Sequence, residues 1–515
     1  MSEHVAVPDG PEHLDVLIVG AGLAGIGAAH HVQADLPGAS FAIFEARDAM
    51  GGTWDLFRYP GVRSDSDMYT LGYPFRPWKE RKSIADGPDI LRYIQDTAAE
   101  DGTDARIRYR HKVLAADWSS DDACWHVTAE RTDAETGEIE RFELTAGFLL
   151  SCSGYYRYDH GYEPDFAGID DFEGTVVHPQ HWPADLDFAG KRVVVIGSGA
   201  TAVTIVPAMA STAAHVTMLQ RSPTYFAALP AVDPLARLLQ RVLPHRAAGP
   251  TIRWYKALST QVSYSLSRRH PERMGKLFIK GVERRLPEGY DVATHFTPTY
   301  GPWDQRLCLI PDGDLLKCIS DGSASVVTDH IETFTPTGIR LKSGDELPAD
   351  IVVTATGLDL LWLGGIELSL DGGAVDVPEH LTYKGVMLEG VPNLVTVFGY
   401  TNASWTLRSD LAAKFATNLV ATMRQRGLRQ VTPVNDEGDV GDEPLLGLSA
   451  GYIERAADRM PRSGSRAPWQ MTQSWVKDRR LLGPEAILDP ALRFSNPARL
   501  ARPAIEPDDL EDVPA

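Results

Sequence analysis

The sequence predicts an α/β protein with two nucleotide-binding units, because one short pattern occurs in it twice. An apolar run of strand character leads into a tight glycine turn at residues 15–25 (DVLIVGAGLAG) and again at residues 192–202 (RVVVIGSGATA). A strand, a Gly-x-Gly turn and a helix form a pyrophosphate cradle, because glycine lets backbone N–H groups approach the phosphates and the helix N-terminus adds partial positive charge. We therefore expect two Rossmann-like dinucleotide-binding domains.

The strand that follows each turn ends differently in the two units. In the first unit, the strand SFAIFEAR ends with Glu45, whose carboxylate can accept hydrogen bonds from an adenosine ribose, as is typical of FAD or NAD sites. In the second unit, the strand HVTMLQRS ends with Gln220, Arg221 and Ser222 and has no carboxylate. An arginine at this place suits the 2′-phosphate of NADP. The two turns together predict two different dinucleotides.

Length, charge and cysteine content narrow the class of protein. A chain of 515 residues is longer than a single hydrophobic core usually supports, so we expect two or three domains. The formal net charge of -20 argues against nucleic acid as a partner, because a duplex binder needs a basic face. The four cysteines have no Cys-x-x-Cys spacing, which indicates neither a disulfide scaffold nor a metal site, and no apolar run approaches the roughly 18 residues that span a bilayer. We expect a cytoplasmic protein.

Two apolar strands that end in a small residue and a glycine divide the chain. They are FLLSCSG at residues 148–154 and IVVTATG at residues 351–357, and we interpret them as crossings between the nucleotide domains. The expected organisation assigns 1–152 to the FAD domain, 153–222 to the NADPH domain, 223–321 to a helical insertion that lines the substrate pocket, 322–383 to the NADPH domain again, and 384–515 to the FAD domain with a C-terminal tail. Each nucleotide domain is thus expected to combine two separated parts of the chain.

The segment from residue 223 to about 296 differs from the rest. Its apolar residues recur with helical spacing (LARLLQRVL, IRWYKALSTQV, MGKLFIKGVERRL), and it contains 12 Lys or Arg against 5 Asp or Glu. One interpretation is a basic surface that contacts anionic lipid headgroups at the periphery of a membrane. The pattern favours the simpler interpretation, an inserted helical lobe with a solvated basic face that walls the substrate pocket.

The segment GGTWDLFRYPGVRSDSDMYT, residues 51–70, is dense in groups that suit a flavin. Its paired glycines let the chain pass close to a planar ring, and Thr53 and Trp54 offer a hydroxyl and an indole N–H beside it. The Tyr-Pro-Gly turn at 59–61 re-aims the chain, so we expect Asp65 to face inward. A disulfide reductase would place a cysteine pair just after its glycine turn, and here there is none. Dioxygen is then the natural acceptor of the flavin's electrons.

At residues 172–183 the sequence FEGTVVHPQHWP resembles a known family. It matches the Baeyer–Villiger monooxygenase fingerprint Phe-x-Gly-x-x-x-His-x-x-x-Trp-Pro at Phe172, Gly174, His178, Trp182 and Pro183, just upstream of the second glycine turn as in that family. The resemblance extends from about residue 14 to residue 480 and includes GGTWDLFRYPG, IGSGATAV, MLQRSPTY, PWDQRLCLIPDGDL and GYTNASWTLR. These phrases look like the ethionamide-activating type of Baeyer–Villiger monooxygenase.

The resemblance implies a reaction and roles for three residues. Family members use NADPH to reduce FAD, which captures O2 as a C4a-peroxyflavin that attacks a ketone and leaves an ester or lactone; the protonated hydroperoxyflavin can oxidise sulfides or thioamides. The family's active-site arginine falls on Arg306, which would stabilise the peroxide as its anion. Asp65 matches the carboxylate that pairs with this arginine, and His178 would serve conformational coupling between the domains.

The same resemblance, together with the two glycine turns, supplies candidate cofactor contacts. Arg63 and Ser64 would touch the nicotinamide half of NADPH when the domains close. The candidates for FAD are Gly20, Gly22, Ala24, Gly25, Glu45, Gly52, Thr53, Trp54, Asp55, Asp65 and the backbone of Val113. The candidates for NADPH are Gly197, Ser198, Gly199, Ala200, Thr201, Ala202, Gln220, Arg221 and Ser222, with Ala202 in place of the third glycine.

Two other functions fit parts of this sequence. A flavin-containing or N-hydroxylating monooxygenase acting on nitrogen or sulfur would share both turns, but Trp182 argues against the first and the phrase around Arg306 against both. A flavoprotein without catalytic activity, which senses NADPH or holds partners, would not need Asp65 and Arg306. We expect hydrophobic substrates, because the helical lobe and the stretch GYTNASWTL are apolar and aromatic. The sequence leaves the physiological ketone and the oligomeric state open.

Overall fold

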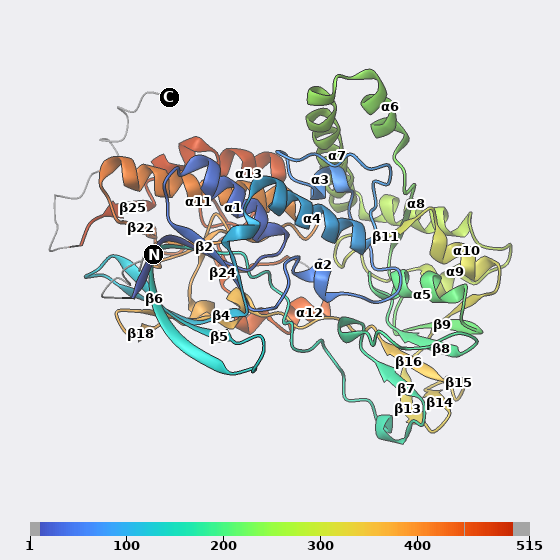
Figure 1. Ribbon diagram of the computed structural model, residues 1–515. Helices are drawn as coiled ribbons and strands as arrows, with labels where there is room; N and C mark the ends of the chain where they lie inside the picture. The colour runs from blue at the N-terminus through green and yellow to red at the C-terminus, as the bar shows by residue number, and fades with distance from the viewer. Residues whose placement is uncertain (1–10, 448, 498–515) are drawn as a thin grey trace, which may run out of the picture.

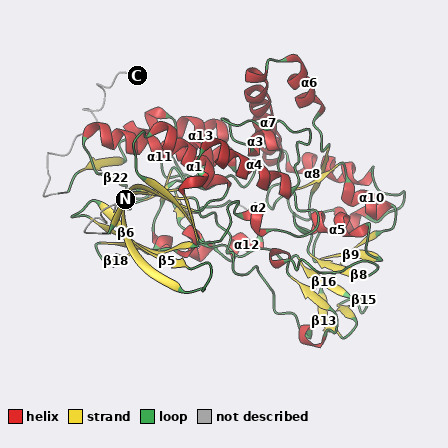
Figure 2. Cartoon of the chain, viewed as in Figure 1, coloured by secondary structure: helices red, strands yellow, loops and turns green. Residues whose placement is uncertain are grey.

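The computed structural model describes residues 11–447 and 449–497, so the expected C-terminal tail from residue 498 onward lies outside the described residues. Its two largest sheets lie apart and hold one glycine turn each (Figures 1 and 2). The nine-stranded sheet has the order β18 (Gly373–Ala374), β17 (Glu367–Leu370), β4 (His111–Ser119), β5 (Cys124–Thr132), β6 (Ile139–Ser151), β1 (Glu12–Val19), β2 (Phe41–Glu45) and β3 (Ile107–Tyr109), and β21 (Leu394–Thr396) also pairs with β6.

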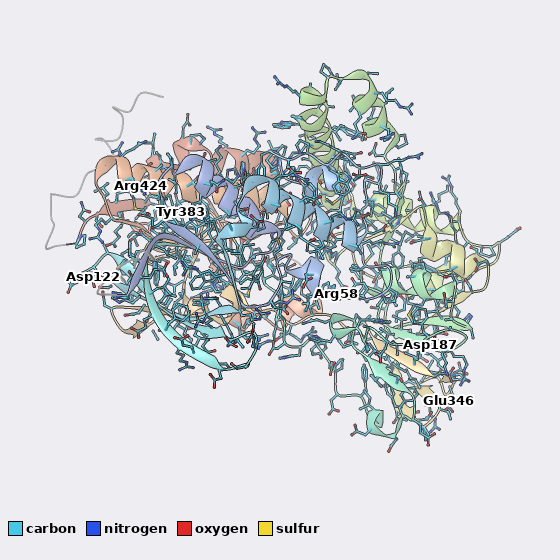
Figure 3. All side chains as sticks on the ribbon, in the orientation of Figure 1. Arg58, Asp122, Asp187, Glu346, Tyr383 and Arg424 are labelled. Atoms are coloured by element: carbon cyan, nitrogen blue, oxygen red, sulfur yellow. The ribbon has the colours of Figure 1, made fainter. Side chains whose placement is uncertain are left out.

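The nine-stranded sheet is parallel around the first glycine turn and antiparallel farther away. β1 runs parallel to β2 and β6, whereas β5 pairs antiparallel with β4 and β6. Its helical cover is visible above the sheet in Figure 1 and consists of α1 (Leu23–Asp35), α4 (Gly87–Asp101), α11 (Thr406–Arg426) and α13 (Trp475–Leu481). Val16 and Ile18 of β1 pack under α1 and α11, while Leu17 between them belongs to the core on the other face, as the alternation of a strand requires. Tyr383, labelled in Figure 3, is fully buried in the first of these cores.

The second sheet is entirely parallel and is covered on both faces. Its order is β12 (Ala324–Thr328), β9 (His215–Gln220), β8 (Arg192–Ile196), β16 (Ile351–Thr354) and β7 (Thr175–Val177). One face packs on α5 (Ala202–Ala210) and α10 (Asp314–Ser320), and the other on the antiparallel strands β13 (Ile331–Thr335), β14 (Gly338–Leu341) and β15 (Glu346–Pro348). Alternate valines of β8 serve the two faces, Val193 and Val195 against α5 and Val194 against β14. This explains the uninterrupted apolar run, which is typical of a parallel strand buried on both sides.

The helical segment expected after residue 223 forms α6 (Pro234–Val242), α7 (His245–Arg269), α8 (Pro271–Glu283) and α9 (Val292–Phe296). In Figure 1, α6 and α7 project from the rest of the chain. Within the described residues, none of the helices combines the length and the apolar character that crossing a membrane requires. The remaining elements are short: α2 (Thr53–Leu56), α3 (Met68–Leu71), α12 (Gly451–Glu454), and the paired strands β10 (Phe226–Leu229) with β11 (Cys308–Pro311), β19 (Thr382–Tyr383) with β20 (Met387–Leu388), β22 (Gln430–Pro433) with β25 (Leu492–Ser495), and β23 (Glu443–Pro444) with β24 (Arg462–Ser463).

Two stretches pack on a sheet to which the expected domain boundaries did not assign them. Helix α10, expected within the helical insertion 223–321, packs its Leu315 and Leu316 into the core of the five-stranded sheet. Strand β17, expected in the NADPH part 322–383, pairs parallel with β4 in the nine-stranded sheet. The chain therefore returns to the first sheet soon after β16. No local sequence pattern indicates where α10 and β17 pack, because long-range strand pairing and core packing determine both positions.

Candidate active site

A cavity of about 1650 Å³ is lined by both glycine turns. Most of the expected site residues face it, and these are Gly20, Gly22, Ala24, Glu45, Gly52, Thr53, Trp54, Arg63, Ser64, Asp65, Val113, Gly197, Ser198, Gly199, Ala200, Thr201, Arg221, Ser222 and Arg306. Those that do not line it are Gly25, Asp55, Ala202, Gln220 and the fingerprint residues Phe172, Gly174, His178, Trp182 and Pro183. The cavity thus collects residues from distant parts of the chain, as an interdomain ligand site does.

The first glycine turn is tightly constrained. Gly20 has a φ of +99°, and a Cβ there would lie 2.7 Å from the carbonyl oxygen of Cys152. A Cβ on Gly25 would lie 1.8 Å from the carbonyl oxygen of Gly20, so this residue matters for the close approach of α1 to the strand rather than for lining the cavity. Helix α1 begins at Leu23, and no side chain caps its N-terminus. Its first N–H groups therefore remain available for an anion in the cavity.

Glu45 lies at the end of β2, where the sequence predicted a carboxylate facing a ribose. Its side chain is buried; one oxygen accepts a hydrogen bond from the Ala21 N–H at 2.8 Å and the other from the Arg47 N–H at 3.0 Å. Burial raises the pKa of this carboxyl above its usual value, and the two backbone N–H groups partly offset that effect. The carboxylate is thus fixed at the rim of the first glycine turn.

The second glycine turn is more open. Gly197 has a φ of +128°, and its Cβ would lie 2.4 Å from the carbonyl oxygen of Ala355, but a Cβ on Gly199 would meet nothing within 4 Å. Helix α5 begins at Ala202, again without a side-chain cap. Arg221 follows β9, is exposed, and lines the cavity, so its guanidinium is available to a phosphate there.

Gln220 requires a correction, because it does not reach the cavity. Its side chain is buried, and its amide donates to the carbonyl oxygen of His295 at 2.8 Å and to Thr328 Oγ1 at 2.9 Å. Gln220 instead joins β9 to α9 and β12.

Asp65 and Arg306 form an ion pair at the cavity, although 241 positions separate them in sequence. The pair that the resemblance implied is therefore present, with both side chains about one-third to two-fifths exposed. The negative charge of Asp65 raises the pKa of Arg306 well above its usual value, which keeps the guanidinium charged. Asp65 comes from the loop before α3 and Arg306 from the loop before β11, so the pair joins the two halves of the site.

Arg63, Ser64 and Asp55, which lie next to Asp65 or Trp54 in sequence, form ion pairs or hydrogen bonds with other residues of the protein. Arg63 forms an ion pair with Asp314 at the start of α10 and therefore ties the first half of the site to the second. Ser64 is buried, and its hydroxyl donates to the carbonyl oxygen of Ser66 at 2.6 Å. Asp55 is also buried; Arg47 donates to it at 2.6 Å and Arg58 at 2.9 Å, so it holds the start of α2 rather than facing a ligand.

The fingerprint loop binds the two chain segments that connect the sheets. Those segments run side by side, because the Arg157 N–H donates to the carbonyl oxygen of Asp359 at 2.9 Å and Tyr156 forms an antiparallel bridge with Leu360. His178 accepts the Gln180 N–H on Nδ1 at 3.2 Å, which leaves the proton on Nε2 for the carbonyl oxygen of Gly357 at 3.3 Å.

Two further side chains of the loop complete this attachment. The Gln180 amide donates to the carbonyl oxygen of Arg157 at 2.8 Å, and His181 Nε2 lies 3.1 Å from the carbonyl oxygen of Asp159. Burial lowers the pKa of His178, which favours its neutral form. The loop HPQH thus holds both connecting segments by their backbone.

The other fingerprint residues pack locally on the second sheet. Phe172 is buried against Phe334, and a Cβ on Gly174 would lie 2.6 Å from the carbonyl oxygen of Asp350. Trp182 is partly buried against the core of the five-stranded sheet, and Pro183 is exposed. Phe172, Gly174 and Trp182 therefore pack the loop on the second sheet, and His178 attaches it to a connecting segment.

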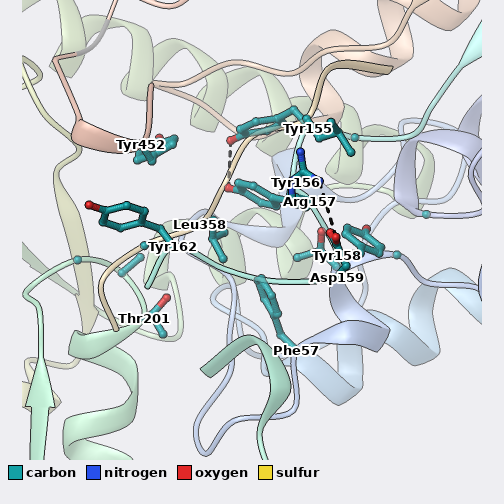
Figure 4. A pocket seen from close by; sticks show the side chains of 18 of the residues that line it. Phe57, Tyr155, Tyr156, Arg157, Tyr158, Asp159, Tyr162, Thr201, Leu358 and Tyr452 are labelled. Atoms are coloured by element: carbon teal, nitrogen blue, oxygen red, sulfur yellow. Dashed lines mark hydrogen bonds and ion pairs between the residues drawn. The ribbon is translucent and has the colours of Figure 1, made fainter. Parts of the chain in front are cut away.

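An aromatic wall beside Arg306 was missed at the sequence level. Tyr155 and Tyr156 line the cavity with their hydroxyl oxygens 3.0 Å apart, and Tyr162 and Tyr452 lie around the same end of it (Figure 4). Burial raises the pKa of Tyr452 to about 12, and Arg306 beside it acts in the opposite direction. The run YYRYDHGY directly after the first crossing strand was the signal that could have found this wall.

The helical insertion contributes to the cavity only through its ends. Thr224, Gln305, Arg306, Cys308 and Leu309 line the cavity, whereas among the described residues none from α6 to α9 does. The expectation that this lobe walls the pocket is corrected accordingly. The physical reason is that the inner face of α7 packs against α3 and α13 instead, as the contacts of Arg253 and Ala257 described below show.

Two open helix N-termini facing one cavity, with a carboxylate at the end of one strand and an arginine at the end of the other, define a protein built for two dinucleotides. The comparisons agree with this class. Residues 14–360 match the model of the family described as flavin-binding monooxygenase-like. The chain is 52% identical to the FAD-containing monooxygenase EthA of Mycobacterium tuberculosis (strain H37Rv), over 94% of this chain and 98% of that protein. The chain therefore belongs to the flavin-binding monooxygenase-like family, and the resemblance noted in the sequence is confirmed.

Solved structures show the same fold. An oxidized steroid monooxygenase bound to NADP has a TM-score of 0.73 at 24% identity, covering 92% of this chain and 98% of that chain. A complex of OTEMO with FAD and NADP has a TM-score of 0.74 at 22% identity, covering 95% of this chain and 100% of that chain. The expected α/β architecture with two Rossmann-like domains and a helical lobe is thus confirmed.

Proposed function

We propose that this protein is an NADPH- and O2-dependent flavoprotein that oxidises hydrophobic ketones to esters or lactones, a Baeyer–Villiger reaction, and that it can also transfer oxygen to sulfides. The observation that supports this most directly is the Asp65–Arg306 ion pair on a cavity shared by two different dinucleotide cradles. The aromatic wall of Tyr155, Tyr156 and Tyr452 supports an apolar substrate. Family relatives named as FAD-containing monooxygenases support the general class.

The residues around the first turn fit FAD. The uncapped start of α1 offers N–H groups to a pyrophosphate, and Glu45 lies where a ribose would follow. Thr53 and Trp54 line the cavity beyond the turn, where a flavin ring would extend. When bound, the flavin supplies the redox and oxygen chemistry that the amino acids lack.

The residues around the second turn fit NADPH rather than NADH. The open space beside Gly199 and the uncapped start of α5 suit a second pyrophosphate. Arg221 is placed to bind the 2′-phosphate that distinguishes NADPH. The nicotinamide end would then point toward Arg63 and the first half of the site.

Arg306 would act by fixed positive charge. Asp65 holds its guanidinium at the cavity, so the charge needs no reorganisation when negative charge develops on the reacting oxygen. Its raised pKa means that Arg306 is not a proton donor. His178 would act at a distance, because its bond to Gly357 makes the position of one connecting segment depend on the fingerprint loop.

Product analysis with a long-chain methyl ketone, NADPH and O2 tests this proposal. An ester that contains one atom from labelled O2 is the expected result. Oxidation at nitrogen or sulfur alone would instead favour a flavin-containing or N-hydroxylating monooxygenase. A protein that binds FAD but takes up no oxygen with NADPH and any ketone or sulfide would point to a non-catalytic flavoprotein.

A further inference from the structure

The helical lobe carries most of the exposed apolar side chains. Fourteen large apolar side chains are exposed among the described residues, and nine of them lie on α6, α7 and α8. They are Leu235, Leu238, Val242, Trp254, Tyr255, Leu258, Val262, Leu266 and Leu277. A contiguous exposed apolar surface is unusual on a soluble protein and indicates an interaction site.

Four of these residues form a stripe along α7. Trp254, Leu258, Val262 and Leu266 recur every four residues, so they lie on one face of the helix, and they are 40% to 56% exposed. We call these four residues the α7 stripe. Tyr255 lies beside it and is 38% exposed. Aromatic rings with a polar atom, such as Trp254 and Tyr255, are the side chains that favour a membrane–water boundary.

The opposite face of α7 is fixed to the rest of the protein. Arg253 is buried and donates to the carbonyl oxygens of Tyr69, Thr70 and Gly72 at 3.2, 3.1 and 2.6 Å. Ala257, on this inner face, is buried in a cluster with Tyr400 and Trp475. The helix is therefore anchored on its inner side. On the stripe, Trp254 contacts Trp475 and Arg479 of α13, with ring centroids 4.5 Å apart and the guanidinium carbon 4.4 Å from the indole centre. Leu258, Val262 and Leu266 are 42%, 56% and 44% exposed.

The charge of the lobe is opposite to that of the whole chain. Residues 234–283 contain ten Lys or Arg against two Asp or Glu, whereas the chain has a formal net charge of -20. Six of the basic side chains are exposed and form no ion pair within the described part of the chain, namely Arg241, Arg246, Arg269, Arg273, Lys276 and Lys280. A partner that neutralises them must be anionic, and a partner that covers the α7 stripe must be apolar.

We propose that the face formed by α6, α7 and α8 docks on the surface of an anionic lipid bilayer. The α7 stripe would enter the boundary between headgroups and acyl chains, and the basic side chains around it would face the headgroups. A second copy of this chain is a poorer occupant, because it would bring two basic faces together. A nucleic acid would neutralise the charge but leave the apolar stripe in water.

The docking face lies close to the cavity, so membrane docking would affect how substrates reach it. Tyr400, which packs with Ala257 of α7, lines the cavity. Near the C-terminal end of α7, the rings of Tyr264 and Trp303 are 5.6 Å apart, and Arg268 forms an ion pair with Asp304. Docking would therefore bring the cavity close to a bilayer in which apolar substrates dissolve. Figure 1 shows α6 and α7 projecting from the rest of the chain, and Leu238, Val262 and Leu277 of this face are 54%, 56% and 60% exposed.

Flotation of the purified full chain with vesicles tests the proposal. The protein should float with vesicles that contain phosphatidylglycerol, should float much less with phosphatidylcholine alone, and should be released by salt. Val262→Gln with Leu266→Gln should weaken binding by about 100-fold, because two apolar side chains no longer leave water. Arg269→Gln, Arg273→Gln and Lys276→Gln together should weaken it by a similar factor of about 100.

A matched control uses apolar side chains that are equally exposed elsewhere. Ile139→Gln with Leu488→Gln should leave vesicle binding unchanged, since these residues are 63% and 43% exposed but lie outside the lobe. All variants should retain the wild-type circular dichroism spectrum. The proposal fails if the protein does not float with anionic vesicles, or if both variants at the lobe float like the wild type. It also fails if light scattering shows that Val262→Gln with Leu266→Gln splits a dimer, because the stripe would then be an interface between copies.

Discussion

The two glycine turns share a strand, a turn and a helix, but they are enclosed differently. In the first turn, α1 begins directly after Gly22, and the backbone of Gly52 lies against that glycine, since a Cβ on Gly52 would be 3.0 Å from the Gly22 Cα. In the second turn, α5 begins only at Ala202, and Gly199 has open space beside it. Ala202 stands at the position that corresponds to Gly25 and is fully buried.

This difference indicates how each cofactor would be held. A turn that is covered by a second segment should retain its ligand through purification, whereas an open turn should exchange its ligand with solution. The ends of the two strands add to the contrast, because Glu45 is buried and hydrogen-bonded while Arg221 is exposed. We therefore expect FAD to remain bound and NADPH to be exchanged.

Removing the positive charge of Arg306, which pairs with Asp65 across the cavity, should have the largest effect on the rate of ester formation. Arg306→Ala should lower kcat for ester formation on the order of 1000-fold, the cost of losing one preorganised group that stabilises an oxyanion. FAD content should stay normal, because the first turn is untouched. The measurement is the rate of ester formation under saturating NADPH.

Arg268→Ala is the matched control, since Arg268 also pairs with an aspartate of the same loop, Asp304, but does not line the cavity. It should keep most of the wild-type rate. Ester formation at an unchanged rate in Arg306→Ala would refute the role assigned to this arginine.

A methyl group at the closest contact of the first turn should prevent FAD retention. Gly25→Ala places a Cβ 1.8 Å from the Gly20 carbonyl oxygen, and relief of this overlap should cost on the order of 3 kcal/mol. Gly199→Ala meets nothing within 4 Å and should retain FAD. Flavin absorbance per protein after gel filtration measures both. Equal FAD content in the two variants would mean that the turns are not enclosed differently.

The exposed arginine of the second turn should decide between the two nicotinamide cofactors. Arg221→Ala should raise KM for NADPH roughly 10-fold to 100-fold, the loss expected for a hydrogen bond to a charged group, and should leave KM for NADH nearly unchanged. Steady-state kinetics with each cofactor provide the measurement. If KM rises equally for both, Arg221 does not bind the 2′-phosphate.

The smallest effect is expected at the loop that connects the two halves. Burial lowers the pKa of His178 from 6.5, so the unfolded chain binds this proton more readily than the folded one. The free energy of unfolding should therefore decrease as the pH falls through 6.5 and below. His178→Gln should reduce this dependence while retaining an amide that can donate to Gly357. Urea unfolding on both sides of pH 6.5 measures it, and an unchanged dependence would contradict the assignment.

The parts of the site that could be predicted from sequence are local in the chain. Each glycine turn with its strand spans about ten residues, and Glu45 and Arg221 follow from the end of the next strand. The structure places both at the cavity. Gln220 was wrongly expected to face it, because its amide donates to His295 and Thr328, two partners that lie 75 and 108 positions away and that no local pattern indicates.

The pairing of Asp65 with Arg306 could not be derived from local patterns. The residues themselves gave only the expectation that Asp65 faces inward, and the partner came from the resemblance to a family. The aromatic wall likewise combines Tyr155 after β6 with Tyr452 on α12, about 300 positions later. Such contacts depend on how the two connecting segments place the sheets.

The sequence by itself determined that this protein has two dinucleotide cradles of different specificity, because glycine positions and strand ends act over a few residues. Tertiary structure decided the rest. It assigned β17 and α10 to their sheets, set the fingerprint loop on the connecting segments rather than in the cavity, and turned the α7 stripe outward. The physical reason is that burial and long-range pairing depend on which surfaces meet in space, and neither the period of a helix nor the alternation of a strand specifies that partner.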